Sequence, residues 1–70
     1  MRYSARNVLK GKIVKLERGI VNSELTLELT GGAQIISVIT NDSVDILNLK
    51  VGIEAYAVIK ASNVMIAVDD

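Results

Sequence analysis

Three short polar clusters in this chain carry the residue types that could bind a ligand. They occupy residues 4–7 (SARN), 39–44 (ITNDSV) and 60–62 (KAS). An Arg side chain offers up to five N–H donors, a Lys three, and Ser and Thr one hydroxyl each. A small oxyanion presents only acceptor oxygens, so its site must be built from donors. Clusters of cations and hydroxyls in so short a chain therefore predict an oxyanion site.

Each cluster also has an ordinary structural explanation when it is taken alone. Ser4 and Asn7 could hydrogen-bond to nearby backbone in an exposed terminal segment. Thr40 and Ser43 could cap a helix, and Lys60 could be a solvated charge at the end of a strand. The chain has no His and no Cys, and nothing indicates a paired catalytic acid and base. We therefore expect a binding protein rather than an enzyme.

Size and composition limit how such a chain can become stable. With 70 residues it forms at most one domain, although half of its residues are hydrophobic. A domain of about 60 residues buries only about 60% of its unfolded surface. Small scaffolds are usually reinforced by disulfides, a structural metal or a partner chain. Without Cys or His, disulfides and the usual zinc sites are excluded. Association with other copies is the remaining solution.

The composition argues against a nucleic-acid-binding protein and against a membrane protein. Eight basic residues balance eight acidic ones, whereas nucleic-acid binding normally requires a basic patch. The chain has no Phe or Trp and only two Tyr, so it has few side chains on which bases could stack. No apolar run approaches the ~20 residues of a membrane span, and no signal-peptide core is present. We expect a soluble cytoplasmic protein.

Residues 8–18 predict a first strand because β-branched and aliphatic side chains dominate them. Gly11, inside this stretch, indicates a β-bulge or a close approach by another backbone segment. A strand bent at a glycine is what a small closed barrel needs at a corner. Gly19 then marks a turn.

The clearest pattern lies in residues 20–30, where three Leu alternate with Glu and Thr. A period of two indicates a strand with one buried and one polar face. Gly31 and Gly32 can supply the positive φ angles of a tight turn. Residues 33–39 are therefore expected to complete a hairpin. Apolar side chains lie on both faces of this second strand, so its outer face needs a cover, which again points to self-association.

The second half of the chain predicts a short helix followed by another hairpin. Residues 41–48 suit one or two helical turns, with an Asn or Asp as cap and an Asp in the first turn. Residues 53–60 alternate again, 62–63 form a turn, and 64–68 are a final short strand. This order is typical of an all-β fold, a five-stranded Greek-key barrel of the oligonucleotide/oligosaccharide-binding (OB) kind with one short helix. The single domain is expected to span residues 1–70.

Several segments together resemble the molbindin family, the small molybdate-binding Mop proteins that consist of a single TOBE-type domain. In chain order the similar segments are SARN (4–7), LKGKI (9–13), GIVN (19–22), IT (39–40), SV (43–44) and VIKASNVM (58–65). Each segment is weak evidence alone. Together they cover essentially the whole chain in order, which makes the resemblance specific.

The resemblance implies a cytoplasmic protein that binds molybdate, and also tungstate, for storage or homeostasis, without a cofactor. It also implies a homohexamer, a trimer of dimers, that holds the oxyanions at its subunit interfaces. The dimer-interface pocket of the family is built from both partners. The matching positions here are Ser4, Arg6, Thr40, Ser43, Lys60, Ala61 and Ser62. A second type of site is implied near the three-fold axis, around residues 20–22.

The chemistry of these positions suits a tetrahedral dianion. One Arg and one Lys would neutralise its charge, and hydrogen bonds from charged donors are roughly twice as strong as neutral ones. Hydroxyls and backbone N–H groups would then orient the anion. Two rival functions stay open from the residues alone: a nucleic-acid-binding OB module and a purely structural assembly domain.

Overall fold

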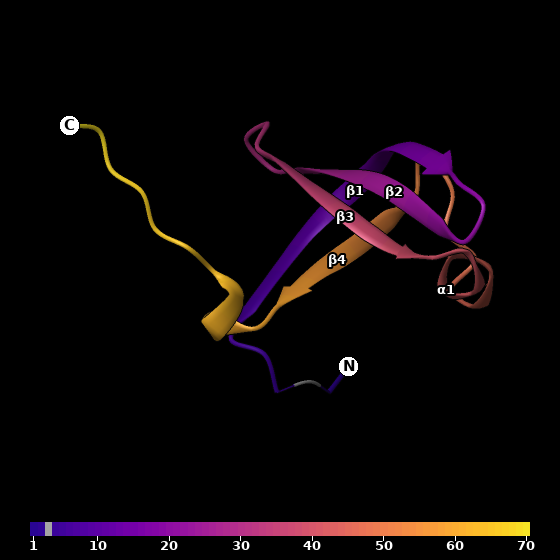
Figure 1. Ribbon diagram of the computed structural model, residues 1–70, viewed down its shortest axis with the longest axis horizontal. Helices are drawn as coiled ribbons and strands as arrows, with labels where there is room; N and C mark the ends of the chain where they lie inside the picture. Colours follow the sequence, from indigo (N-terminus) through magenta and orange to yellow (C-terminus); the bar gives the residue numbers. More distant parts are fainter. Residues whose placement is uncertain (3) are drawn as a thin grey trace.

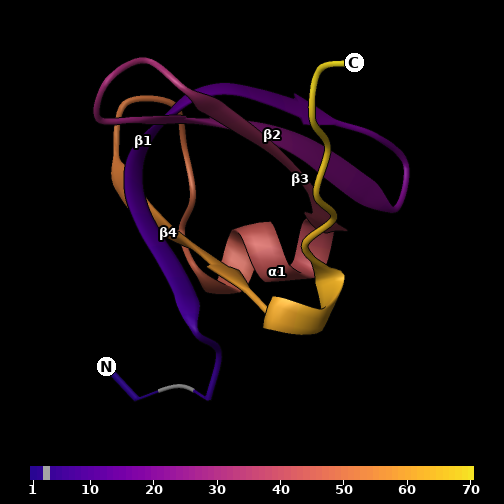
Figure 2. The same cartoon turned by 90° about the vertical axis from the view of Figure 1, so that its left-hand side faces the viewer.

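The computed structural model describes residues 1–2 and 4–70. Its centre is one curled antiparallel sheet of four strands in the order β3-β2-β1-β4 (Figures 1 and 2). A short helix, α1, lies at one end of the sheet, and a 3₁₀ turn, η1, lies at the other (Figure 1). The elements are β1 (Asn7–Arg18), β2 (Asn22–Leu29), β3 (Gln34–Thr40), α1 (Asn41–Ile46), β4 (Glu54–Ile59) and η1 (Ala61–Asn63).

Strand β1 is the longest element and pairs with both of its neighbours. Its first half faces β4 and its second half faces β2, and both pairings meet at Gly11. A Cβ atom on Gly11 would lie 2.6 Å from the carbonyl oxygen of Glu28, so the predicted close backbone approach is confirmed. The register irregularity of β1 lies between Ile13 and Lys15 rather than at the glycine.

The predicted hairpin is formed by β2 and β3. Leu25 and Leu27 are buried and the glutamates of β2 are exposed, as the alternation requires. Thr26 departs from the pattern, since it is buried as well. Gly31 and Gly32 have φ angles of 96° and 95°, which confirms the left-handed turn predicted for them.

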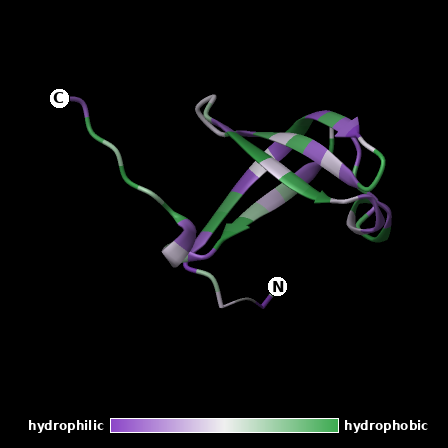
Figure 3. Ribbon diagram, in the orientation of Figure 1, coloured by the Kyte–Doolittle hydropathy of each residue, from purple (hydrophilic) through white to green (hydrophobic). Residues whose placement is uncertain are grey.

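The hydrophobic core lies inside the curl of the sheet and is small. Its buried side chains are Ile13, Leu25, Leu27 and Val44. Val44 comes from α1, which thereby covers one end of the core. Seven further hydrophobic residues pack against this cluster but are only partly buried. The helix has six residues, within the one or two turns predicted, and the chain turns away just after it, where Asn48 adopts a φ of 53°. Figure 3 shows apolar and polar residues alternating along the strands.

The prediction of a fifth strand at residues 64–68 is not met within this chain. The backbone is extended at Val64, but residues 64–70 form no strand pairing. They run away from the sheet (Figure 1). A strand requires a neighbour for its backbone hydrogen bonds, and this segment reaches none in its own copy. The all-β, OB-like class with one short helix is therefore confirmed, with four strands rather than five.

Within the residues that the structure describes, no helix has the length and apolar character that crossing a membrane requires.

Replacing Gly11 by Ala should destabilise the fold, because the new methyl group would collide with the Glu28 carbonyl and with Leu27 Cγ, 2.9 Å away. Forcing extra atoms into a packed site typically costs about 1–3 kcal/mol. Urea unfolding at fixed protein concentration measures the change. Lys12→Ala, on the exposed neighbouring residue, is the control and should stay close to the wild-type stability. Equal stabilities for the Gly11 variant and the wild type would contradict the close approach.

Candidate functional site

The first and third polar clusters meet at one end of the sheet. Asn7 opens β1 and pairs with Ile59, the last residue of β4. The Asn7 amide Nδ2 also donates a 3.4 Å hydrogen bond to the Ile59 carbonyl, across 52 positions of sequence. This pairing brings residues 4–6 next to residues 60–62, as Figure 1 shows where the N-terminal segment passes η1.

The hydrogen-bond donors at this end of the sheet are exposed, and the two cations among them form none of the described ion pairs. Ser4, Arg6, Lys60 and Ser62 are all exposed. The ion pairs among the described residues use Lys10, Lys15 and Arg18 as cations, and neither Arg6 nor Lys60 takes part in one. We call this group, with Ala61, the Lys60 half-site.

The turn η1 shapes the backbone of the Lys60 half-site. It uses the N–H groups of Asn63 and Val64 for its own hydrogen bonds, to the carbonyls of Lys60 at 2.9 Å and Ala61 at 3.3 Å. The N–H groups of Ala61 and Ser62 precede the first bond of the turn, so the turn leaves them for other acceptors. Both cations and two backbone donors are therefore available for an acceptor-only ligand.

The second cluster has a structural role that is now visible. Thr40 is the N-cap of α1: its Oγ1 accepts a 3.1 Å hydrogen bond from the Ser43 N–H and donates a 2.9 Å bond to Ser43 Oγ. Asn41 accepts from Ser23 Oγ and donates to the carbonyls of Gly19 and Ile20. The helix cap is thereby tied to the loop between β1 and β2. We call Thr40 and Ser43 the Thr40 half-site.

A single copy does not bring the two half-sites together. Thr40 ends β3 and Lys60 follows β4, and these strands form opposite edges of the sheet. The helix α1 and the turn η1 also lie at opposite ends of the sheet (Figure 1). The seven residues selected from the sequence thus form two separate groups, five around Lys60 and two around Thr40.

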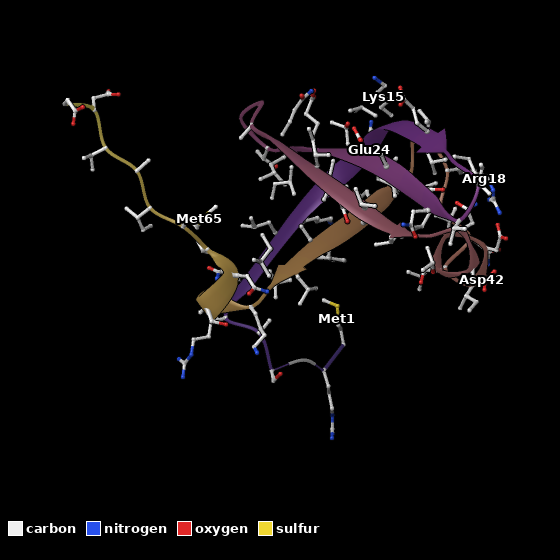
Figure 4. The ribbon with its side chains drawn as sticks, in the orientation of Figure 1. Met1, Lys15, Arg18, Glu24, Asp42 and Met65 are labelled. Atoms are coloured by element: carbon white, nitrogen blue, oxygen red, sulfur yellow. The ribbon has the colours of Figure 1, made fainter. Side chains whose placement is uncertain are left out.

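Another charged contact was not foreseen from the sequence. The Arg18 guanidinium donates two 2.8 Å hydrogen bonds to the two carboxylate oxygens of Asp45, joining β1 to α1. Hydrogen bonding to Arg18 lowers the pKa of Asp45. Figure 4 shows Arg18 beside the helix. The partners are 27 positions apart and no local pattern links them, so only the fold could identify the pair.

The Arg18–Asp45 pair also bears on where an anion could bind. A shallow, open hollow beside α1 contains Arg18, Asp45 and Lys50. The bound carboxylate already compensates the charge of Arg18, which makes the hollow a poorer place for a dianion than the Lys60 half-site. Among the residues described, no group of three or more His, Cys, Asp or Glu could hold a metal cation.

The family model of the TOBE domain matches residues 3–66 of this chain. The chain belongs to the TOBE domain family. Molybdenum-pterin-binding protein 1 from Clostridium pasteurianum is 52% identical over 66 residues, which cover 94% of this chain and 97% of that relative. The expected resemblance to the small Mop proteins is thereby confirmed.

Solved structures with high sequence identity show the same fold. MopII from Clostridium pasteurianum, in an apo form, has a TM-score of 0.91 and 49% identity, and the match covers 96% of this chain and all of MopII. The cytoplasmic molybdate-binding protein ModG, crystallised with molybdate bound, has a TM-score of 0.89 and 52% identity. That match covers 93% of this chain and 46% of ModG. The MopII match thus extends over nearly the whole of this chain.

Replacing Thr40 by Val should destabilise α1, because the side chain that caps the helix disappears while the size of the residue is kept. The loss of such a cap typically costs about 1 kcal/mol. Thr40→Ser keeps the hydroxyl and should remain close to the wild type. Thermal unfolding of both variants without added anion tests the structural role alone. If the Val and Ser variants were equally stable, the capping hydrogen bond would contribute nothing.

Proposed function

We propose that this TOBE domain binds molybdate, and tungstate as its chemical analogue, as a store or buffer of the anion. The observation that supports the proposal is the pairing of Asn7 with Ile59, which places the segments that carry Arg6 and Lys60 at one end of the sheet. The chain is also similar over most of its length to a molybdenum-pterin-binding protein and to a molybdate-binding protein. The relatives are named for binding and not for a reaction, and we infer a binding protein without a cofactor.

The ligand chemistry follows from the donors of the Lys60 half-site. Molybdate is a tetrahedral dianion, so one Arg and one Lys match its charge. Neither cation is committed to a carboxylate in the described ion pairs, so no existing bond must break. The hydroxyls of Ser4 and Ser62 and the backbone N–H groups of η1 then supply neutral, directional hydrogen bonds.

The separation of the half-sites supports a pocket shared between copies. An exposed group of donors on one chain leaves much of a bound anion in water, where charge interactions are weak. Another copy that covers the Lys60 half-site would exclude that water. It could also add Thr40 and Ser43, because Ser43 Oγ accepts the hydrogen bond from Thr40 and keeps its own O–H free to donate to an anion. We therefore propose a homo-oligomer, a hexamer built as a trimer of dimers, with all seven residues at its interfaces.

Exposed apolar side chains fit this assembly. Ile36 and Val38 on the outer face of β3 are 64% and 63% exposed, the uncovered second face that the sequence predicted. At the tip of the β1–β2 loop, Ile20 is fully exposed and Val21 is 66% exposed. This loop is where the resemblance implies a second type of anion site. Its two apolar residues suit contact with other copies, and the proposal assigns no anion ligand among them.

We also propose that the protein is cytoplasmic and that its barrel has five strands when assembled. ModG is described as cytoplasmic, which supports the same compartment for this chain. A fifth strand at residues 64–68 would complete the barrel in the assembled protein. A nucleic-acid-binding function has no comparable support, because the net charge is zero and no dense basic run is present.

Replacing Lys60 by Met should weaken molybdate binding while leaving the fold intact. The substitution keeps much of the aliphatic stem but removes a charge-assisted hydrogen bond, worth roughly 1.5–3 kcal/mol. Since each 1.4 kcal/mol is about tenfold in affinity, binding should fall by at least about tenfold. Arg6→Met should act similarly, and the double variant should be non-additive because both cations contact one ligand. Calorimetric titration measures each affinity.

Lys12→Met is the matched control, because Lys12 is an exposed strand lysine that takes part in none of the described ion pairs. It should bind molybdate like the wild type. The size of the unliganded particle should be unchanged in every variant, since removing a cation from an empty anion pocket relieves repulsion. Wild-type affinity in both single variants would remove Arg6 and Lys60 from the site.

The site should distinguish molybdate and tungstate from smaller oxyanions. Sulfate has the same shape and charge but is smaller, so a rigid pocket shared by two chains would leave buried donors unpaired around it. Each unpaired buried group costs about 1–3 kcal/mol, so sulfate should bind roughly tenfold or more weakly. Phosphate should give little response. Titration of the wild type with each anion at constant ionic strength measures the difference, and equal affinities for sulfate and molybdate would refute a size-selective pocket.

A further inference from the structure

The inner face of the β1–β2 hairpin changes from apolar to polar near its loop. Side chains of directly paired residues share one face of a sheet. Leu16 pairs with Leu25 beside the core, and the next pair on that face, toward the loop, is Arg18 with Ser23. Ser23 is only 1% exposed, so its hydroxyl needs a hydrogen-bond partner inside the protein. Both polar side chains find their partners on α1.

Helix α1 meets this end of the hairpin with two side chains that lie one turn apart. Asn41 Oδ1 accepts the hydrogen bond of Ser23 Oγ. The Asp45 carboxylate accepts both hydrogen bonds of the Arg18 guanidinium. Residues four positions apart lie on the same face of a helix, so one face of α1 is held at two points. We call these four residues the helix clamp, and Figure 1 shows the β1–β2 loop beside α1.

Asn41 forms the stronger arm of the helix clamp. Its Nδ2 donates to the first two carbonyls of the loop residues 19–21, at 2.9 and 3.3 Å. Its backbone N–H donates to the third carbonyl at 2.8 Å, so one residue of α1 binds three consecutive carbonyls of the loop. The Arg18–Asp45 arm is weaker, because its side chains are 47% and 60% exposed and water screens their attraction.

The helix clamp matters because α1 is too short to be stable by itself. The helix has six residues, and Val44 is its buried residue in the core. One apolar anchor fixes the depth of a helix against a sheet but not its orientation. The polar contacts of the clamp supply the orientation, and they begin at Asn41, directly after the N-cap. Thr40 Oγ1 donates a 2.9 Å bond to Ser43 Oγ, so both hydroxyls of the Thr40 half-site move with this first turn.

We propose that the helix clamp positions the Thr40 half-site for the anion, with Ser23 and Asn41 as its main positioning residues. The inference rests on the proposed function, in which the Ser43 O–H donates to the anion. Ser23 and Asn41 do not themselves touch the ligand, because their hydrogen bonds already join them to each other and to the loop. Binding to a preformed group of donors avoids the entropy cost of ordering them, so the clamp raises the affinity for the anion.

Calorimetric titration of the intact protein with molybdate tests the role of Asn41. Asn41→Leu keeps the approximate size of the side chain but removes its hydrogen bonds. Molybdate should then bind about two- to tenfold more weakly, the effect of losing one neutral hydrogen bond. Gln34→Met is the control, because Gln34 is exposed and takes part in none of the described side-chain hydrogen bonds. It should bind like the wild type.

A double variant separates positioning from stability. Asn41→Leu alone leaves the buried Ser23 hydroxyl unpaired, so it should also lower the stability measured by urea unfolding. Ser23→Ala/Asn41→Leu removes both partners, and its stability should return toward that of the wild type. Its affinity for molybdate should stay reduced, because the loop and the helix are still not joined. Recovery of affinity together with stability would mean that the pair is merely structural and would overturn the proposal.

The action of the clamp through Ser43 has its own test. In a Ser43→Ala background the positioned donor is absent, so adding Asn41→Leu should weaken binding by less than about twofold. An equal loss of affinity in both backgrounds would show that Asn41 acts by another route and would refute the inference.

Hydrogen exchange without added anion examines the clamp independently of binding. The Leu47 amide donates to the Ser43 carbonyl at 3.0 Å and reports on α1. Its exchange should become faster in Asn41→Leu, while the amides of β4 exchange as in the wild type. Unchanged exchange at Leu47 would contradict the clamp. A wild type that binds no molybdate would refute the proposed function and this inference with it. Binding by the wild type with full affinity in Asn41→Leu would overturn this inference alone.

Discussion

The limited amount of apolar surface that one copy can bury is the constraint on which the rest of this structure depends. Among the residues that the structure describes, four hydrophobic side chains are buried, and seven others that pack against them are only partly buried. Each buried aliphatic side chain contributes about 1.5–3 kcal/mol, so a core of this size leaves little margin over chain entropy. The open edges of β3 and β4 and the exposed segment after η1 show where the missing burial lies. Association between copies would supply it without disulfides or metals.

The same constraint shapes the binding site. In one copy, the pairing of β1 with β4 collects two cations at one end, and the cap of α1 fixes two hydroxyls at the other. Neither group alone encloses an anion. If assembly completes the core, the interfaces that bury apolar surface also remove water from around the donors. Charge interactions strengthen as the local dielectric falls, so a site with few polar residues can still hold a dianion.

Local signals made much of the fold predictable from sequence. The alternation in β2 and the paired glycines of its turn act over a few positions, and both were recognised correctly. The helix was also predicted, but its N-cap is Thr40, one residue before the Asn41 or Asp42 expected as the cap. The fifth strand failed for a non-local reason: the apolar pattern of residues 64–68 is present, but a strand also needs a neighbour for its backbone hydrogen bonds, and these residues pair with none of the described strands. The Arg18–Asp45 pair was missed for a related reason, since charges on unrelated elements become neighbours only through the tertiary fold. For the site, donor types and the resemblance selected seven residues, yet only the topology divided them into two half-sites.

Binding and assembly are therefore expected to be thermodynamically coupled. Arg6 and Lys60 repel each other wherever an interface brings them together, and a dianion between them turns that repulsion into attraction. A ligand that binds only the assembled form stabilises it by RT ln(1 + [L]/Kd), about 2.7 kcal/mol at a hundredfold excess over Kd. Molybdate would then strengthen the assembly that creates its own pocket, and dilution of the protein would weaken binding. If the pocket forms only where copies associate, a small domain could in this way act as a buffer of the anion without any further conformational change.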